Sequence, residues 1–389
     1  MPKIIAIITE YNPFHNGHKY QIDKIKEQEP DSTIIAIMSG NIVQRGEFAI
    51  LDKYTRAKMA VMCGVDAVFE LPYPYSGSTA EIFAYGGVNL ASSLGADILY
   101  FGTESESLDL LIEMAKVIDS EEYEKAFSSI KNDNLSFPQA REKALSLLGY
   151  KISQSSNDIL AIEYIRQITK NAPHMEYRNI KRVGAGYNDV DVSQIMSATG
   201  IRREFYEKNE LLSLPQEAKE IFVEASDKGL VKRYNADCEL LYKYVLLSQP
   251  QSLENTFDAP CGVGYFLWNR AKESCDGESF YEKLSSKQFT TSRLKRATLY
   301  SIFNIKKPFL LKKNFTVLLG CNEKGKKIIK TAKSNKSIVV LTKHADSKKL
   351  NKSQKRIYDI LMRVDEIYQT LLVSAKSPKE AYNNIPFIK

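Results

Sequence analysis

The sequence predicts an α/β protein whose N-terminal part is built on a doubly wound, mostly parallel sheet. Strands and helical stretches alternate from residue 3 onward, and the first strand, 3–9, contains the unbroken apolar run 4–8. A strand that is buried on both faces of a parallel sheet shows such an unbroken run. Repeated strand–helix units favour parallel strands joined by right-handed crossovers.

Four strands with intervening helices are expected in the first 120 residues. Their ranges are strand 3–9 and a helix from about 18, strand 33–40 and helix 53–63, strand 65–72 and helix 79–93, and strand 97–104. Residues 108–170 are expected to be mainly helical, with one helix ending before Gly149 and another capped by Ser156. A strand-like segment at 175–184 and a short helix opening at Val192–Ser193 follow.

Three consecutive regions are expected along the chain. Residues 1–205 form the α/β domain, 206–285 a helical and acidic connecting region, and 286–389 a basic region with one more strand–helix–strand unit and an amphipathic helix. With 389 residues the chain is too long for one ordinary core, which agrees with several domains.

The composition is that of a globular protein, with 43% hydrophobic and 26% charged residues. Apolar runs such as 4–8 and 34–38 are far shorter than a membrane span, and the N-terminus leads directly into a strand without a signal peptide. We therefore expect a cytoplasmic protein without a membrane partner.

The five cysteines are scattered and show no C-x-x-C spacing, so neither a disulfide framework nor a structural zinc site is expected. The oligomeric state is not indicated.

Charge is distributed unevenly along the chain. Residues 287–389 carry 24 Lys or Arg and 6 Asp or Glu, a net charge of +18, whereas residues 1–286 carry 30 basic and 41 acidic residues, a net charge of −11. A basic block on an acidic body is typical of a polyanionic partner. A merely solvated lysine-rich surface explains the charge alone equally well.

The strongest chemical signal is TEYNPFHNGHKYQI at residues 9–22, where the first strand ends and a helix begins. Ligands of open parallel sheets bind at such a point. Gly17 allows a tight turn and a close approach to phosphate, and the helix N-terminus offers unpaired N–H groups. His15 and His18, three residues apart, can donate hydrogen bonds to a nucleotide's α-phosphate as its negative charge grows. A zinc site is a poorer interpretation without nearby carboxylates, and purely structural histidines are the other alternative.

These residues resemble the HxGH signature of the HIGH-type nucleotidyltransferase superfamily. A second segment, MSATGIRRE at 196–204, resembles the second phosphate motif of that superfamily. The match implies that Ser197, Thr199 and Arg202 hold the β- and γ-phosphates, for which hydroxyl groups and a guanidinium are suited. By itself this segment is also an ordinary helix cap.

A closer resemblance, over nearly the whole chain, is to the bacterial tRNA(Met) cytidine acetate ligases. The segments that carry it are EYNPFHNGH, MSGNIVQRGEFAILDKYTRAKMA, VDAVFELP, YFGTE, SSNDILAIEYI and IKRVGAGYND. Such enzymes activate acetate with ATP and place the acetyl group on N4 of the wobble cytidine of elongator tRNA(Met). Magnesium is expected to arrive with the ATP phosphates.

The resemblance also implies the residues of the ATP site. They are Ile7, Ile8, Thr9, Glu10, Tyr11, Asn12, Pro13, Phe14, His15, Asn16, Gly17, His18, Lys19 and Tyr20, together with Gly102, Asn157 and Arg182. Gly102 at a strand end would let adenosine lie on the backbone, Asn157 at a helix start would bond to base or ribose, and Arg182 would neutralise phosphate. A strand-end turn, a helix cap and a surface charge are their ordinary structural roles.

The loop GNIVQRGEFAILDK at 40–53 follows the second strand and should lie over the same sheet edge. Arg45 is a candidate to hold a small carboxylate, and Gly46 would let the loop close. An ion pair of Arg45 with Glu47 or Asp52 that stabilises the loop is an equally good interpretation.

The basic region contains FTTSRLKRATLYSIF at 289–303, in which Arg293, Lys295 and Arg296 cluster beside Tyr300. Such a stretch suits phosphate contacts and base stacking in RNA. Further lysines extend it, namely Lys306, Lys307, Lys312, Lys313, Lys324, Lys326, Lys327 and Lys330. An amphipathic helix that packs on its own domain would show similar residues.

Two other functions fit parts of the pattern. A cofactor-building nucleotidyltransferase that joins ATP to a phosphorylated small molecule would use the same histidines, but gives the basic region no purpose. An RNA-binding protein with an inactive nucleotide site would not need His15, His18 and Arg202.

Overall fold

The computed structural model describes most of the chain. The described residues are 2–105, 107–130, 135, 137–150, 155–182, 196–249, 253, 256–259, 262–273, 289–307, 311, 313–334 and 338–389. The expected helix opening at Val192–Ser193, Lys312 and the expected border at residue 285 lie outside these ranges. None of the described helices is both long and apolar enough to cross a membrane.

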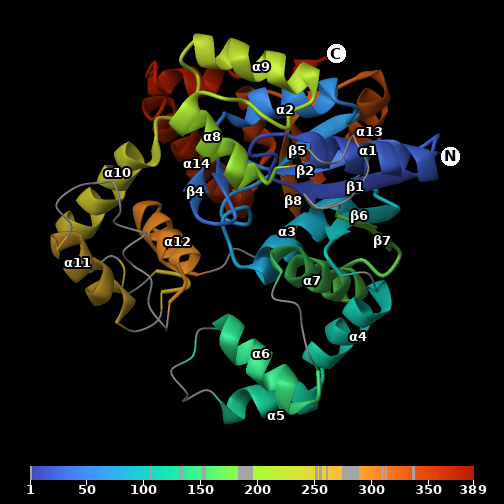
Figure 1. The fold of residues 1–389 in the computed structure, drawn as a ribbon. Coiled ribbons are helices and arrows are strands. Elements are labelled where there is room, and N and C mark those ends of the chain that lie inside the picture. Colours follow the sequence, from blue (N-terminus) through green and yellow to red (C-terminus); the bar gives the residue numbers. More distant parts are fainter. Residues whose placement is uncertain are drawn as a thin grey trace. The chain divides into compact units, whose positions relative to one another are not determined.

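The predicted α/β architecture is confirmed, with strands and helices alternating in the first hundred residues (Figure 1). These elements are β1 Ile4–Thr9, α1 Asn16–Gln28, β2 Thr33–Ser39, β3 Ile42–Val43, β4 Glu47–Phe48, α2 Lys53–Met62, β5 Ala67–Leu71, α3 Ala80–Ser93 and β6 Ile98–Thr103. All residues of β2 and β5 are buried, as expected for continuously apolar central strands.

The remaining elements are mostly helical. They are α4 Leu108–Ile118, α5 Glu121–Ser129, α6 Phe137–Leu147, α7 Ser156–Asn171, β7 Glu176–Lys181, α8 Ala198–Lys208, α9 Gln216–Asp227, α10 Asn235–Ser248, α11 Val263–Glu273, α12 Thr291–Ile302, β8 Asn314–Cys321, α13 Glu323–Ser334, β9 Ile338–Leu341, the 3-10 helix η3 His344–Lys349, α14 Lys352–Thr370, the 3-10 helix η4 Pro378–Asn383 and β10 Phe387–Ile388. The α7 cap is the Ser155 hydroxyl, which accepts from Asp158 N at 3.1 Å, and not Ser156.

The main sheet has the strand order β10-β8-β5-β2-β1-β6-β7, with β9 beside β8. Strand β1 is parallel to β2 on one side and to β6 on the other, and β2 is parallel to β5. The chain therefore builds the sheet outward from β1 in one direction and then in the other. The carboxyl end of β1 is the switch point at which open α/β sheets bind ligands.

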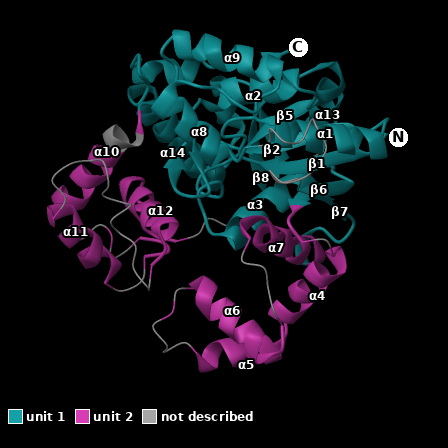
Figure 2. Cartoon of the chain, viewed as in Figure 1, with its two compact units in different colours: residues 1–102, 170–233, 309–389 teal, residues 103–169, 234–308 magenta. Residues whose placement is uncertain are grey.

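The chain forms two compact units, each assembled from separate segments (Figure 2). Unit 1 consists of residues 1–102, 170–233 and 309–389, and unit 2 of residues 103–169 and 234–308. These borders differ from the three consecutive regions expected from the sequence. The physical reason is that β8, from the basic region, pairs antiparallel with β5 and so covers an edge of the sheet that would otherwise be open.

Candidate active site

The HNGH segment forms the N-terminus of α1 directly after β1. Helix α1 begins at Asn16, two residues earlier than expected, because His15 is its N-cap with an extended backbone (φ −144°, ψ 174°). Gly17 N donates to His15 Nδ1 at 3.1 Å, and His15 N donates to His18 Nδ1 at 3.2 Å. The two histidines thus form a reciprocal capping box, in which Ser or Thr and Glu are the common residues.

These hydrogen bonds determine which ring nitrogens carry protons. A backbone N–H can only donate, so both Nδ1 atoms accept and each neutral ring carries its proton on Nε2. Burial, reinforced by the Arg182 charge, lowers the pKa of His15 to about 3, and burial together with the charges of His15 and Arg182 lowers the pKa of His18 well below its usual value. The rings stack with their centroids 3.7 Å apart. The pair is therefore a neutral double donor, suited to an anion that gains charge.

The turn before the histidines has an unusual backbone. Tyr11 has φ +46°, in the left-handed region that non-glycine residues rarely adopt. Its ring lies 4.8 Å from the rings of both Phe14 and His18 and is almost completely buried. This packing holds the turn in its conformation and fixes the position of His18. Strain of this kind, retained by the surrounding packing, is frequent at functional sites.

The second phosphate motif lies beside this turn. Ser197 caps α8 by accepting from Gly200 N at 3.2 Å, and Arg202 in the same helix donates from Nη1 to the Asn12 carbonyl at 2.7 Å. Thr199 accepts a longer hydrogen bond from Arg202 Nη2 at 3.4 Å. The structure therefore brings the two predicted motifs together, although 190 positions separate Asn12 from Arg202.

Ser213 connects the two motifs and was not found from the sequence. Its carbonyl accepts from Asn16 N at 2.8 Å and its hydroxyl from Met196 N at 2.9 Å, and its own φ is +62°. One residue thus joins the beginnings of α1 and α8. A serine between two leucines carries no sequence signal for such a role, apart from the proline two residues later that starts α9.

Gly102 and Arg182, also predicted from the resemblance, are neighbours. A Cβ atom at Gly102 would lie 3.2 Å from Arg182 Cγ, so the arginine stem lies against the glycine at the end of β6. The Arg182 charge also reaches both histidines, as their lowered pKa values indicate. Asn157 belongs to unit 2, where its amide donates to Glu104 Oε1 at 2.7 Å.

Within 7–20 the residues differ in what they offer a ligand. The side chains of Ile7 and Phe14 are buried, so only their backbone is available, and Lys19 is paired with Asp23 at 2.5 Å. Gly17 has a helical backbone inside α1, so the expected tight turn at this residue is not observed. What Gly17 offers a ligand is the absence of a side chain beside the histidines. Glu10 accepts from Gln44 N at 2.8 Å.

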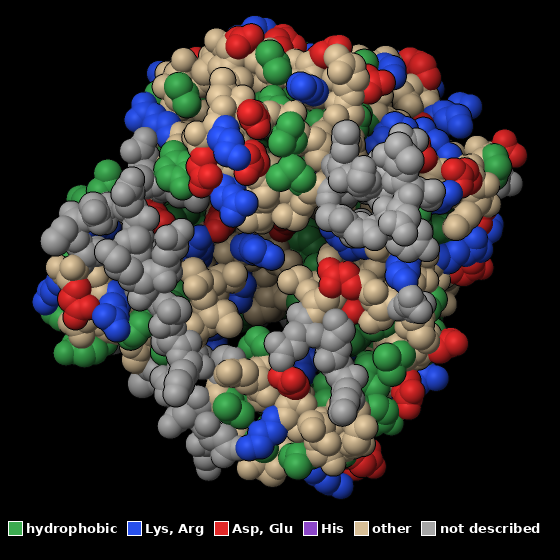
Figure 3. All heavy atoms as spheres, viewed as in Figure 1, with side chains coloured by type: hydrophobic (Ala, Val, Ile, Leu, Met, Phe, Trp, Pro, Cys, Tyr) green, Lys and Arg blue, Asp and Glu red, His purple; other side chains and the backbone are tan. Residues whose placement is uncertain are grey.

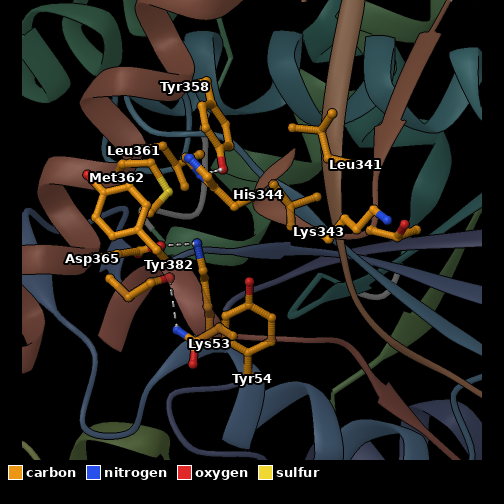
Figure 4. Close-up of a pocket in the computed structure, with 14 residues that line it drawn as sticks. Lys53, Tyr54, Leu341, Lys343, His344, Tyr358, Leu361, Met362, Asp365 and Tyr382 are labelled. Atoms are coloured by element: carbon orange, nitrogen blue, oxygen red, sulfur yellow. Dashed lines mark hydrogen bonds and ion pairs between the residues drawn. The ribbon is translucent and has the colours of Figure 1, made fainter. Parts of the chain in front are cut away.

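A small cavity in the same unit contains none of residues 7–20 (Figure 4). It lies over Lys53, whose ammonium is 2.8 Å from Glu70 and 2.6 Å from Asp365, all three side chains being buried. On another wall, His344 Nδ1 is 2.9 Å from Tyr358 Oη. These side chains bond to one another between α2, β5 and α14, so we assign the cluster a structural role.

The predicted RNA residues on α12 are arranged differently from the expectation. Arg293 and Arg296 both bind Asp258, at 3.1 and 3.2 Å, and Tyr300 is fully buried against Phe257, so it cannot stack on a base. Tyr300 thus packs inside its own unit, as the alternative interpretation of an amphipathic helix predicted. On the face drawn in Figure 3, the coloured basic and acidic side chains are interspersed, so the charge asymmetry of the sequence does not produce one continuous basic surface there.

The α/β sheet, the histidine pair at the carboxyl end of β1 and the α8 motif define a HIGH-type nucleotidyltransferase. The sequence model of the HIGH nucleotidyltransferase family matches residues 2–383. A protein of Caldicellulosiruptor bescii named tRNA(Met) cytidine acetate ligase is 35% identical over 340 residues, which cover 85% of each chain. One of the same name from Fusobacterium nucleatum is 34% identical over 402 residues, covering 99% of this chain and 98% of the relative. The chain therefore belongs to the tRNA(Met) cytidine acetate ligase family.

The solved structures agree. The crystal structure of Thermotoga maritima TmcAL bound with alpha-thio ATP matches with a TM-score of 0.90 and 27% identity, over 99% of both chains. The comparisons thus support the family that the sequence resembles, and they give no support to a cofactor-building enzyme or to an inactive RNA-binding protein.

Proposed function

We propose that this chain is an ATP-dependent ligase that forms acetyl-adenylate from acetate and transfers the acetyl group to N4 of the wobble cytidine of elongator tRNA(Met). The observation that carries the proposal is the neutral His15–His18 pair, whose Nε2–H groups are left for a ligand at the switch point of the sheet. The names of the relatives, and the ATP analogue in the Thermotoga maritima structure, supply the substrates.

In the first step, an acetate oxygen attacks the α-phosphorus of ATP and pyrophosphate leaves. Negative charge grows on the α-phosphate oxygens, where His15 and His18 donate from Nε2. Because the rings are held by backbone hydrogen bonds before the substrate binds, little reorganisation is needed. The open N-terminus of α8, Ser197, Thr199 and Arg202 would hold the outer phosphates. Mg²⁺ would neutralise those phosphates.

In the second step, the exocyclic amine of cytidine attacks the acetyl carbon of the adenylate and AMP leaves. The amide forms as the amine loses a proton and the acyl–phosphate bond breaks. Gly102 would let the adenosine lie on the end of β6, and Arg182, whose stem lies against Gly102, would neutralise the α-phosphate. Asn157 would contact the base or ribose. We expect this chemistry in the cytoplasm, where ATP and tRNA are available.

The RNA contact that the structure supports best is on α13. Lys324, Lys327 and Lys330 recur every three residues on this helix and are all exposed. They belong to the basic region singled out by the sequence. Arg293 and Arg296 remain candidates for RNA contact only if they leave Asp258, whereas the α13 lysines can meet phosphates without breaking an ion pair seen in the structure.

Transfer of labelled acetate to RNA tests the proposal. The protein is incubated with ATP, Mg²⁺, ¹⁴C-acetate and an elongator tRNA(Met) transcript, and the RNA is digested and analysed for N4-acetylcytidine. We expect label in this nucleoside, dependent on ATP. The matched control is the same transcript with uridine in place of the wobble cytidine, which lacks the amine. Equal labelling of both transcripts, or none of either, would contradict the proposal.

A further inference from the structure

Arg45 lies at the tip of a hairpin that reaches the histidine turn. The hairpin is made of β3 and β4, and its turn is closed by Gly46, which has φ +76° and donates from N to the Val43 carbonyl at 2.9 Å. The Arg45 side chain is exposed. Asp52, one of the partners considered from the sequence, is instead the N-cap of α2 and accepts from Tyr54 N at 2.8 Å.

The hairpin tip and α8 converge on the same short stretch of chain. Gln44, next to Arg45, donates from its backbone N to Glu10 Oε1 at 2.8 Å, and Arg202 donates to the Asn12 carbonyl, two residues further along. Burial raises the pKa of the Glu10 carboxyl, while the Gln44 hydrogen bond and the charges of Arg202 and Arg45 oppose this shift. The hairpin tip and Arg202 thus meet the histidine turn at neighbouring residues, Glu10 and Asn12.

This placement bears on what Arg45 binds. In attack at phosphorus, the incoming and leaving oxygens lie roughly in line, on opposite sides of the phosphorus atom. Under the proposed function, Arg202 holds the outer phosphates and hence the leaving side. An arginine at the hairpin tip, which meets the turn two residues from the carbonyl that Arg202 binds, would lie on that same side, away from the incoming acetate.

We propose that Arg45 is a second polyphosphate-binding residue, which acts with Arg202 on the β- and γ-phosphates of ATP and on the departing pyrophosphate. This assignment replaces our sequence-based interpretation of Arg45 as the acetate anchor. Glu10 accepts from the hairpin backbone at Gln44 and so holds the hairpin tip at this stretch before the nucleotide binds. The inference rests on ATP being the substrate, as proposed above.

The hairpin backbone that carries Arg45 is held on two sides. Its outgoing strand leads to Ile50, whose N donates to Asn12 Oδ1 at 2.8 Å, and the Ala49 carbonyl accepts from Tyr368 Oη of α14 at 3.0 Å. At its base, Asn41 donates to Asp365 of α14 at 2.9 Å. The hairpin that carries Arg45 is thus supported from both the histidine turn and the C-terminal helix, which favours a preorganised phosphate site.

The test compares ATP with AMP, because only ATP has the outer phosphates. Arg45→Ala and Arg45→Lys are titrated with each nucleotide by calorimetry, in the presence of Mg²⁺. We expect Arg45→Ala to weaken ATP by about 10- to 100-fold, the usual effect of losing a charge-assisted hydrogen bond, and AMP by less than about twofold. Arg45→Lys should fall between, since it keeps the charge but not the two-pronged donor. Arg202→Ala should show the same ATP-selective loss.

The matched control is Arg203→Ala, which removes an arginine next to Arg202 whose side chain is 66% exposed and 4.0 Å from Glu204. It should leave both affinities unchanged. The acetate KM in pyrophosphate exchange at saturating ATP is measured for the same proteins, and it should stay at the parent value in Arg45→Lys. If the Ala variant fails to fold, Arg45→Gln is used in its place.

Two results would overturn the assignment. A raised acetate KM with unchanged ATP affinity would make Arg45 the acetate anchor after all, and equal affinities of parent and variant for ATP would make it a surface residue. The titrations need no acetate. If the parent failed to use acetate while the Arg45 variants still lost ATP selectively, the proposed function would fall and the polyphosphate role would stand.

Discussion

Unit 1 contains two buried polar clusters near the carboxyl ends of its parallel strands, and they differ in how their hydrogen-bonding capacity is used. In the cluster after β1, His15 and His18 accept from backbone N–H groups and are neutral. In the cluster beside β5, Lys53 donates to both Glu70 and Asp365, so that two carboxyl groups share one ammonium. In the first cluster, neither Nε2–H group bonds to a described residue, and we propose that both serve a ligand, whereas the second cluster is satisfied internally.

Burial of ionisable groups therefore does not by itself mark a catalytic site. In the Lys53 cluster, burial raises the pKa of Glu70 to about 7, but the partners in this cluster are all protein groups. The Lys53 cluster joins α14 to α2, and Asn41 joins α14 to the base of the β3–β4 hairpin. The histidine rings are neutral, and their Nε2–H groups bond to no described residue. Stability should therefore depend on the Lys53 cluster and activity on the histidine pair.

The largest expected effect is on stability. Lys53→Met removes the cation and leaves two carboxyl groups buried without it, which should lower the free energy of unfolding by about 3–5 kcal/mol. The measurement is the urea midpoint at pH 7. Lys58→Met is the matched control on the same helix: its partner Glu224 is 3.4 Å away and both side chains are exposed, so a loss below about 1 kcal/mol is expected. Equal losses in the two variants would remove the structural role of the cluster.

The histidine variants should show the opposite behaviour. His15→Asn and His18→Asn keep an acceptor at the position of Nδ1, and Asn is a favoured N-cap, but both lose the Nε2–H donor. Each should reduce acetate-dependent pyrophosphate exchange by about 100- to 1,000-fold, or roughly 2.7–4 kcal/mol in the barrier, with little change in the urea midpoint at pH 7.5. Exchange at the parent rate in both variants would show that the pair is structural.

The pH dependence of stability separates the clusters further. Because His15 and His18 have lowered pKa values when folded, the unfolded chain binds more protons below about pH 6.5, and stability falls as the pH falls. Between pH 7.5 and 5.5 each histidine should cost about 1.4 kcal/mol, a loss that the double Asn variant should lack. Glu70 acts in the opposite direction, since its raised pKa favours the folded state as the pH falls toward 4.5. Parallel pH curves for parent and double variant would contradict the neutral-pair assignment.

The smallest expected effect concerns RNA. Replacing Lys324, Lys327 and Lys330 with Ala should weaken tRNA binding. The slope of the logarithm of the binding constant against the logarithm of the salt concentration should become shallower by about two to three, because each phosphate contact contributes about 0.7–0.9 to this slope. Exchange without tRNA should stay at the parent rate. Replacing Lys208, Lys219 and Lys228 removes the same charge from α8 and α9, where two of the lysines are already paired with glutamates, and should change the slope far less. An unchanged slope in the α13 variant would place the RNA elsewhere.

Much of this arrangement could be predicted from local pattern. Unbroken apolar runs predicted β1 and β2, and the histidine spacing placed His15 and His18 on one turn. Contacts between distant segments could not be predicted. The pairing of β8 with β5, the bridge through Ser213 and the binding of both Arg293 and Arg296 to Asp258 each join residues without a shared sequence pattern. A basic, aromatic stretch such as 289–303 looks alike whether it faces RNA or its own unit, and only the burial of Tyr300 decided between these interpretations.

The most direct test of the central claim is ATP–pyrophosphate exchange by the parent protein without tRNA, with acetate, other small carboxylates and phosphate monoesters each offered in turn. We expect exchange that requires ATP and acetate and that falls about 100- to 1,000-fold in His15→Asn, because the histidine pair stabilises the charge that grows on the α-phosphate and this step needs no tRNA. Exchange that ignores acetate but requires a phosphate ester would contradict it, as would the absence of exchange with every carboxylate.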